Sequence, residues 1–269
     1  MANLAESVAQ VSLKDSSEGH GAGVARLEKD VEEVGDPYRD HLSGSAEKDT
    51  IWRHGNAPRY EQVNALFESG RTQVWPTGSL EETVQNLVKT WEMELSHKTK
   101  VTDFKTIDQE KFCISVNGGP KFSAAETLQV GSYNALLATS SFQGDNAIYQ
   151  SSKETFESSH DIFRTVFPGG FAWEVQAVYS PPPVVVMKYR HWGVMEGAYK
   201  GHAPTGEVVD SVGIVVAKVD ENLKILELEV YYDTAAFLGG LTKGPKSEGY
   251  TSYQKGVEGC PYLNHGRLQ

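Results

Sequence analysis

The chain has 269 residues, which is long enough for one self-sufficient hydrophobic core. Its formal charge of −11 argues against nucleic-acid binding and against simple electrostatic docking on anionic membranes, because both need a basic excess. No apolar run approaches the roughly 18 residues of a membrane-spanning helix, and no basic stretch followed by an apolar run marks a secretory signal. We therefore expect a cytosolic protein that does not span a membrane.

The two cysteines, Cys113 and Cys260, lie far apart, and no Cys/His cluster surrounds them. A zinc site needs several such ligands at close spacing. The sequence also lacks a phosphate-binding loop, a calcium loop and the H-E-x-x-H pattern of metalloproteases. We expect no metal and no cofactor.

Composition divides the chain into four parts. Residues 1–36 are polar and carry eight acidic against three basic residues, a charge of −5, and we expect them to be disordered. Residues 37–78 form an extension whose aromatic residues pack on the core. Residues 79–241 carry the regular hydrophobic patterns of the main domain, and residues 242–269 form a glycine-rich tail.

The first half of the main domain is predicted to be mostly helical. Ser79 and Glu82 have the spacing of a capping box, and apolar residues then recur at helical spacing as far as Leu95. A strand over residues 111–116 and a short helix capped by Ser123 follow. A second long helix is predicted over residues 152–167, where aromatic residues and His160 share one stripe.

Four strands follow in close succession, at residues 171–179, 184–194, 208–219 and 224–232, joined by short connections. Consecutive strands of this kind predict an antiparallel meander. Helices followed by a curled sheet give an α+β fold, which we expect to be a cone-shaped antiparallel sheet wrapped over helices around an internal pocket.

Several motifs carry a resemblance to a known family. The runs Gly193–Gly197 (G-V-M-E-G), Gly201–Gly206 (G-H-A-P-T-G) and Ile225–Glu227 (I-L-E), with Asp233 after the last strand, resemble the SnoaL-like polyketide cyclases of the nuclear-transport-factor-two-like superfamily. Over most of its length the chain resembles the plant pathogen-related proteins more closely still. That likeness is carried by the runs Glu47–His54, Gly78–Asn86, Thr90–His97 and Lys200–Gly206.

The resemblance implies a bent sheet over helices with an apolar cavity at its wide end. Superfamily members include isomerases, epoxide hydrolases and cyclases, and also binding and adaptor proteins without catalytic activity. The fold therefore leaves the function open, and the residues of the cavity must decide it.

Strand 184–194 places Tyr189 and His191 on its less charged face, which we expect to line the cavity. A histidine there would serve as a general base or orient a polar ligand atom. The alternative is a hydrogen-bonded histidine with a structural role. The same two interpretations hold for His160.

The resemblance also points to Asp233, because an acidic residue in the cavity transfers the proton in SnoaL-like cyclases. Burial of a carboxyl in an apolar pocket would raise its pKa toward neutrality. The alternation of the last strand, however, puts Asp233 on the face opposite its apolar residues. The expected cavity walls, for which plain core packing is the alternative, are Trp91, Leu95, Phe163 and Trp173.

Two hypotheses follow. The first is a small-molecule-binding or adaptor protein of plant defence or specialised metabolism, which holds an apolar metabolite or assists a biosynthetic enzyme. The second is a cofactor-free isomerase or cyclase in which Asp233 or His191 moves protons. We also expect a homodimer through the outer face of the sheet, where Lys188, Arg190 and Trp192 would stand opposite Glu227 and Glu229.

Overall fold

The computed structural model describes residues 36–39, 47, 49–139 and 147–246, all within the unit Gly35–Gln269. Six strands form one sheet in the order β2-β1-β6-β5-β4-β3, antiparallel throughout except for the parallel pair β1 and β6. The strands are β1 (Cys113–Val116), β2 (Phe122–Ser123), β3 (Ala172–Ser180), β4 (Val184–Val194), β5 (Val208–Val219) and β6 (Ile225–Tyr232). The predicted α+β class and the meander of the last four strands are confirmed.

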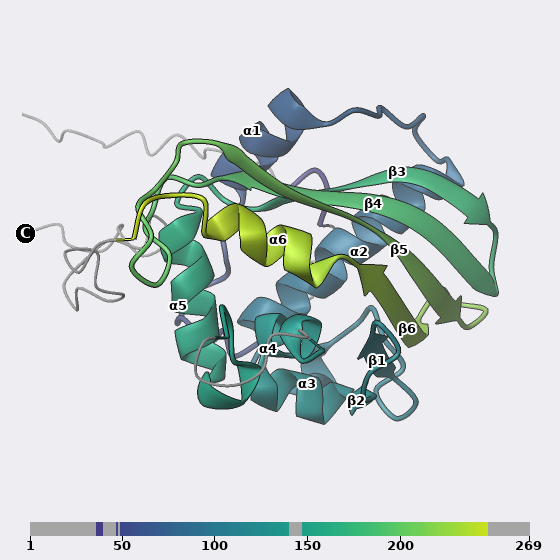
Figure 1. The fold of residues 1–269 in the computed structure, drawn as a ribbon. Coiled ribbons are helices and arrows are strands. Elements are labelled where there is room, and N and C mark those ends of the chain that lie inside the picture. Colours follow the sequence, from purple (N-terminus) through teal and green to yellow (C-terminus); the bar gives the residue numbers. More distant parts are fainter. Residues whose placement is uncertain (1–35, 40–46, 48, 140–146, 247–269) are drawn as a thin grey trace, which may run out of the picture. The chain divides into compact units, whose positions relative to one another are not determined.

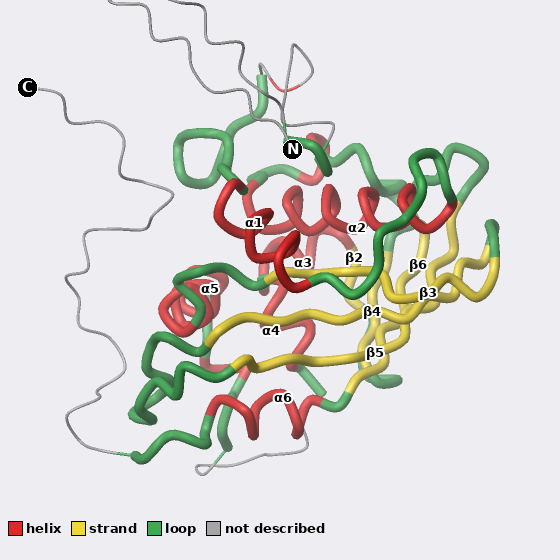
Figure 2. The backbone as a smooth tube through the Cα atoms, turned by 90° about the horizontal axis from the view of Figure 1, so that it is seen from above, coloured by secondary structure: helices red, strands yellow, loops and turns green. Residues whose placement is uncertain are grey.

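Helices pack on both faces of this sheet (Figure 1). The inner face is covered mainly by α2 and α6, α5 lies beyond the end of the strands, and α1 lies near β3 and β4 (Figures 1 and 2). The helices are α1 (Glu61–Gly70), α2 (Leu80–His97), α3 (Ala124–Val130), α4 (Ser132–Leu137), α5 (Phe156–Val166) and α6 (Thr234–Leu241), with 3₁₀ turns at Val101–Asp103 and Ser151–Lys153. The predicted disordered segment, the loop 140–146 and most of the tail lie outside the described residues.

Local sequence sets the helix ends. The Ser79 hydroxyl accepts from the Glu82 amide at 3.2 Å, as expected for the cap of α2, although the Glu82 carboxylate accepts from the Gly78 amide instead of completing the box. α5 begins four residues later than predicted. Thr155, in an extended conformation, caps it with Ser158, and the residues before Thr155 form a separate 3₁₀ turn.

The inner face of the sheet holds the main core. Inward side chains of β3 to β6 meet the apolar stripe of α2, which contributes Val84 and Leu95 as buried members. A second core lies between α5, α6 and the start of β5, centred on Phe163 and Leu238. These two clusters fix α2 and α5 on the same side of the sheet.

The outer face corrects one expectation. Trp192, predicted to be exposed at a dimer interface, is only 2% exposed because α1 covers it. Its ring lies 6.4 Å from that of Phe67, and a Cβ at Gly70 would come within 2.8 Å of the indole, so α1 needs glycine there. Val212 and Tyr231 stay exposed farther along this face. Self-association there stays a prediction, which light scattering would test.

A buried ion pair joins α2 to the chain on either side of it. The Lys98 ammonium, which is fully buried, lies 3.0 Å from Glu94 and 3.1 Å from Glu47, and it donates to the Asp103 carbonyl. The Glu94 carboxylate also accepts from the backbone amides of Lys105 and Thr106. One network therefore joins the end of α2 to Glu47 and to the turn after the helix.

We expect Lys98→Met to lower the free energy of unfolding by about 3–5 kcal/mol, because the substitution leaves two buried carboxylates without their shared cation. Chemical denaturation followed by far-UV circular dichroism measures this loss. Lys111→Met is the matched control: Lys111 pairs with Asp108, but its side chain is 70% exposed, so its removal should hardly move the midpoint. Equal midpoints for the two variants would contradict the assigned role of Lys98.

Candidate functional site

A cavity of about 150 Å³ lies beside the amino-terminal end of β3. Its walls come from one face of α2, from α4 and α5, from the first residues of β3, and from the segment 54–60 that leads into α1. Six of the lining residues are aromatic and bring flat, apolar surface to it: Tyr60, Tyr133, Phe163, Phe167, Phe171 and Trp173. A cavity of this composition fits a small organic molecule.

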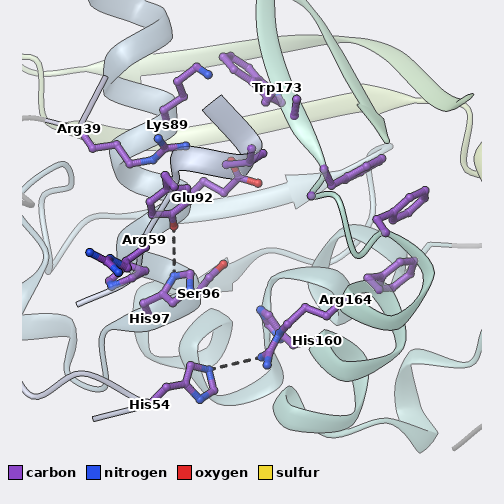
Figure 3. A pocket seen from close by; sticks show the side chains of 18 of the residues that line it. Arg39, His54, Arg59, Lys89, Glu92, Ser96, His97, His160, Arg164 and Trp173 are labelled. Atoms are coloured by element: carbon purple, nitrogen blue, oxygen red, sulfur yellow. Dashed lines mark hydrogen bonds between the residues drawn. The ribbon is translucent and has the colours of Figure 1, made fainter. Parts of the chain in front are cut away.

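The polar side of the cavity is a stripe on α2. Lys89, Glu92 and Ser96 follow one another at helical spacing and all line the cavity (Figure 3). One turn earlier on the same stripe, the buried Gln85 side chain accepts from the Val175 amide of β3 at 3.3 Å. That contact holds the stripe against the edge of the sheet.

Glu92 supplies the only carboxyl group among the described lining residues. Of its side-chain surface 37% is accessible, and the residue lines the cavity. Burial raises the pKa of Glu92, against the opposing effect of the Arg39 and Lys89 charges. The carboxyl is thus placed to give or take a proton within the cavity.

His191 stands directly behind Glu92. Its Nε2 lies 3.7 Å from the Glu92 Oε1, a distance too long for a hydrogen bond, and this buried nitrogen has no hydrogen-bond partner among the described residues. The imidazole packs on the Phe171 ring at 3.8 Å between centroids. Burial lowers the pKa of His191 to about 3, so the ring is neutral at physiological pH.

Lys89 is 2% exposed and has no carboxylate within ion-pair distance in the described part of the chain. Its ammonium lies instead over the Phe67 ring at 3.4 Å and near the Tyr38 ring at 4.7 Å. Aromatic faces stabilise a cation less than a carboxylate does. Burial, together with the nearby Arg39 charge, therefore lowers the pKa of Lys89 to about 7.

Histidines line the opposite end of the cavity (Figure 3). The His97 Nδ1 lies 3.2 Å from the Met93 carbonyl and 3.3 Å from the Tyr60 hydroxyl. The His54 Nε2 lies 3.4 Å from the Arg164 guanidinium. Burial lowers the pKa of His97 to about 3, and burial also lowers the pKa of His54.

Three of the predicted ligand-binding residues line the cavity: His160, Phe163 and Trp173. The His160 Nδ1 lies 2.7 Å from the Phe156 carbonyl and its Nε2 lies 3.2 Å from the Ser132 hydroxyl, so both ring nitrogens have partners. Its pKa is lowered by burial to about 4. His160 thus lines the cavity while both of its ring nitrogens have partners within the protein, and its role in binding stays a prediction.

The other predicted walls lie in the core. Leu95 is buried, Trp91 packs partly buried against the same cluster, and Tyr189 is buried behind the Trp173 ring at 5.8 Å between centroids. None of the three is among the lining residues.

The two predicted catalytic residues occupy different places. His191 faces inward as expected but sits behind Glu92 and is not itself a lining residue. Asp233 is exposed and caps α6 by accepting from the Ala236 amide at 2.9 Å. The outward register read from the last strand accounts for its position.

Within the described residues, no group of three or more His, Cys, Asp or Glu side chains could hold a metal ion. No helix in this part of the chain is long and apolar enough to cross a bilayer.

Fold and site together define an α+β protein with a curved sheet over helices and a cavity that aromatic residues and a carboxyl group line. No protein-family model matches the chain. It is 43% identical over 231 residues to the pathogen-related protein of barley, Hordeum vulgare, a match that covers 85% of this chain and 95% of the relative. The chain belongs to the pathogen-related protein family.

Solved structures align more weakly. A protein assigned as a polyketide cyclase from Acidithiobacillus ferrooxidans aligns in full with 64% of this chain, at 13% identity and a TM-score of 0.39. A protein with a ketosteroid isomerase-like fold from Catenulispora acidiphila aligns over 93% of its length with 59% of this chain, at 10% identity and a TM-score of 0.34. Alignments of this kind describe the backbone and carry nothing about a ligand.

We expect stability to fall as the pH drops from 6.5 to 5. The unfolded chain binds protons at its histidines near pH 6.5, whereas His97, His160 and His191 keep depressed pKa values in the folded state. The unfolded state then binds more protons, and each histidine costs up to about 1.4 kcal/mol per pH unit. Urea denaturation at several pH values measures the slope.

His191→Phe should flatten that slope by the share of one histidine, because the phenyl ring keeps the packing on Phe171 and removes the titrating group. The buried Nε2 has no partner to lose among the described residues, and the hydrogen bond between the imidazole and the Phe171 backbone is the one polar contact there that the change removes. A slope identical to that of the parent would show that His191 is not held neutral.

Proposed function

We propose that this protein binds a small organic molecule with a largely apolar body in the cavity between α2, α5 and the segment 54–60, and that Glu92 meets the polar group of that molecule. The observation that carries the proposal is the Glu92 carboxyl, which is the only carboxyl group among the described lining residues of a cavity that also has six aromatic ones. Aromatic walls hold the body of a ligand, and a single polar group fixes its orientation.

The name of the barley relative supports a role in the response of plants to pathogens, and specialised metabolites are the small molecules of that setting. In this proposal the protein holds such a metabolite, either alone or in support of an enzyme that makes it. The cytosol is the proposed site of action.

A second candidate is a cofactor-free isomerase or cyclase. In that case Glu92 is better placed than Asp233 to transfer the proton. Glu92 has a pKa raised by burial and faces the cavity, whereas Asp233 is an exposed helix cap. The Nε2 of the neutral His191 lies 3.7 Å from the Glu92 Oε1. A slight displacement of the carboxyl by a ligand would bring the two groups within hydrogen-bond distance. A general acid or base typically contributes about 10²–10⁴-fold to a rate.

The test is a comparison of what three forms of the protein retain from a barley leaf extract, read by mass spectrometry. Ser96→Phe adds a ring inside the cavity, while Val208→Phe adds the same ring at a position that is exposed on β5. We expect a small molecule that the parent and Val208→Phe retain and that Ser96→Phe does not. Identical retention by all three forms would contradict both candidates.

Glu92→Gln then separates binding from catalysis, because the amide keeps the shape of the side chain but exchanges no proton. Once the retained molecule is known, the parent and Glu92→Gln are incubated with it and its conversion is followed. We expect no conversion by either form. Conversion by the parent that Glu92→Gln slows by about 10²-fold or more, with retention preserved, would establish the second candidate.

A further inference from the structure

Lys89 is the buried group that neither candidate function uses. It lies one helical turn before Glu92 on the same stripe of α2, lines the same cavity, and is 2% exposed. Lys98, the other buried lysine among the described residues, has carboxylate partners and lies between Glu94 and Glu47. Lys89 has aromatic rings in their place.

We propose that Lys89 is a covalent capture site for carbonyl compounds, and that its amine condenses with a small aromatic aldehyde or ketone in the cavity to form an imine. This step needs the cavity to admit a small molecule, as in the proposed function, but it does not depend on the ligand of that function. The placement of an amine at the wall of an aromatic cavity, without a carboxylate to hold it as an ammonium, carries the inference.

The charge state favours the reaction. The uncharged amine is the nucleophile, and a lysine of ordinary pKa has only about one amine in 10³ uncharged at pH 7. Burial and the Arg39 charge bring the pKa of Lys89 to about 7, which leaves roughly half of it as free amine. The carboxylates of Glu92, Asp36 and Glu68 act in the opposite direction but leave the pKa far below its ordinary value.

The chemistry balances without an oxidant or a reductant. The nitrogen lone pair of Lys89 attacks the carbonyl carbon, a C–N bond forms as the C=O π bond breaks, and a first proton passes from the nitrogen to the oxygen to give a carbinolamine. The hydroxyl then leaves as water while the nitrogen gives up a proton, so the net change is the loss of one water. The Glu92 carboxyl, kept protonated to higher pH by burial, stands on the next turn to protonate the departing hydroxyl.

The experiment treats the full-length protein at pH 7 with benzaldehyde and sodium cyanoborohydride, which reduces an imine to a stable benzylamine. Peptide mapping by mass spectrometry gives the modified fraction at each lysine. We expect Lys89 to be benzylated at least about tenfold faster than the exposed Lys111, since far more of its amine is uncharged. Lys98, fully buried between two carboxylates, should stay unmodified in the same digest.

The pH profile is a second readout. The rate at Lys89 should rise to half its plateau near pH 7, whereas the rate at Lys111 should keep rising well above pH 9, because its pKa is raised by Asp108. Lys89→Met should abolish the fast modification and leave the slow background at exposed lysines. If this variant does not fold, the modified fractions at the individual lysines of the parent protein still test the proposal.

Modification of Lys89 no faster than that of Lys111 would overturn the inference. Ligand-observed NMR, which compares benzaldehyde binding to the parent protein and to the Ser96→Phe variant, then shows whether the cavity-binding proposal fails together with the imine proposal. Benzaldehyde that enters the parent cavity without modifying Lys89 removes the imine and leaves the binding proposal standing. Benzaldehyde that reaches neither the cavity nor Lys89 counts against both.

Discussion

The buried pair of Glu94 and Lys98 is the constraint on which the cavity depends. It ties the last turn of α2 to Glu47 and to the turn at 103–106, so the helix end cannot shift without exposing charge to apolar surroundings. The backbone at the end of α2 also binds the extension. Trp52 forms an antiparallel bridge with Lys98, and the Arg53 amide donates to the His97 carbonyl at 2.8 Å. The segment that follows, 54–60, forms one wall of the cavity.

Three different sides of α2 therefore contact the core, the extension and the cavity. Its apolar stripe, with Val84 and Leu95, enters the core against the sheet. The Glu94–Lys98 pair faces the extension, and the polar stripe of Lys89, Glu92 and Ser96 faces the cavity. Because the helix is held on all sides, the two titratable groups of the polar stripe have fixed positions relative to the aromatic wall. A cavity built on a rigid helix keeps its geometry better than one built on loops.

The helices and strands can be predicted from the sequence because strand alternation and helix periodicity are local patterns. The bounds of β4 and β5 follow from their hydrophobic patterns, and the stripe containing Phe163 is buried as predicted. The site is less accessible to such patterns. A stripe of Lys89, Glu92 and Ser96 opposite an apolar stripe has the pattern of a solvated helix face. It is enclosed here because α1 and the 54–60 segment close over it, and contacts between segments so far apart in sequence leave no periodicity.

The cavity differs from the rest of the molecule in charge. The chain carries −11, yet four of the described lining residues are arginine or lysine and only Glu92 is acidic. Enclosure acts on Glu92 and Lys89 in opposite directions, since it raises the pKa of the carboxyl and lowers that of the ammonium. Enclosure thereby favours the neutral forms of two groups that stand one turn apart on the same helix.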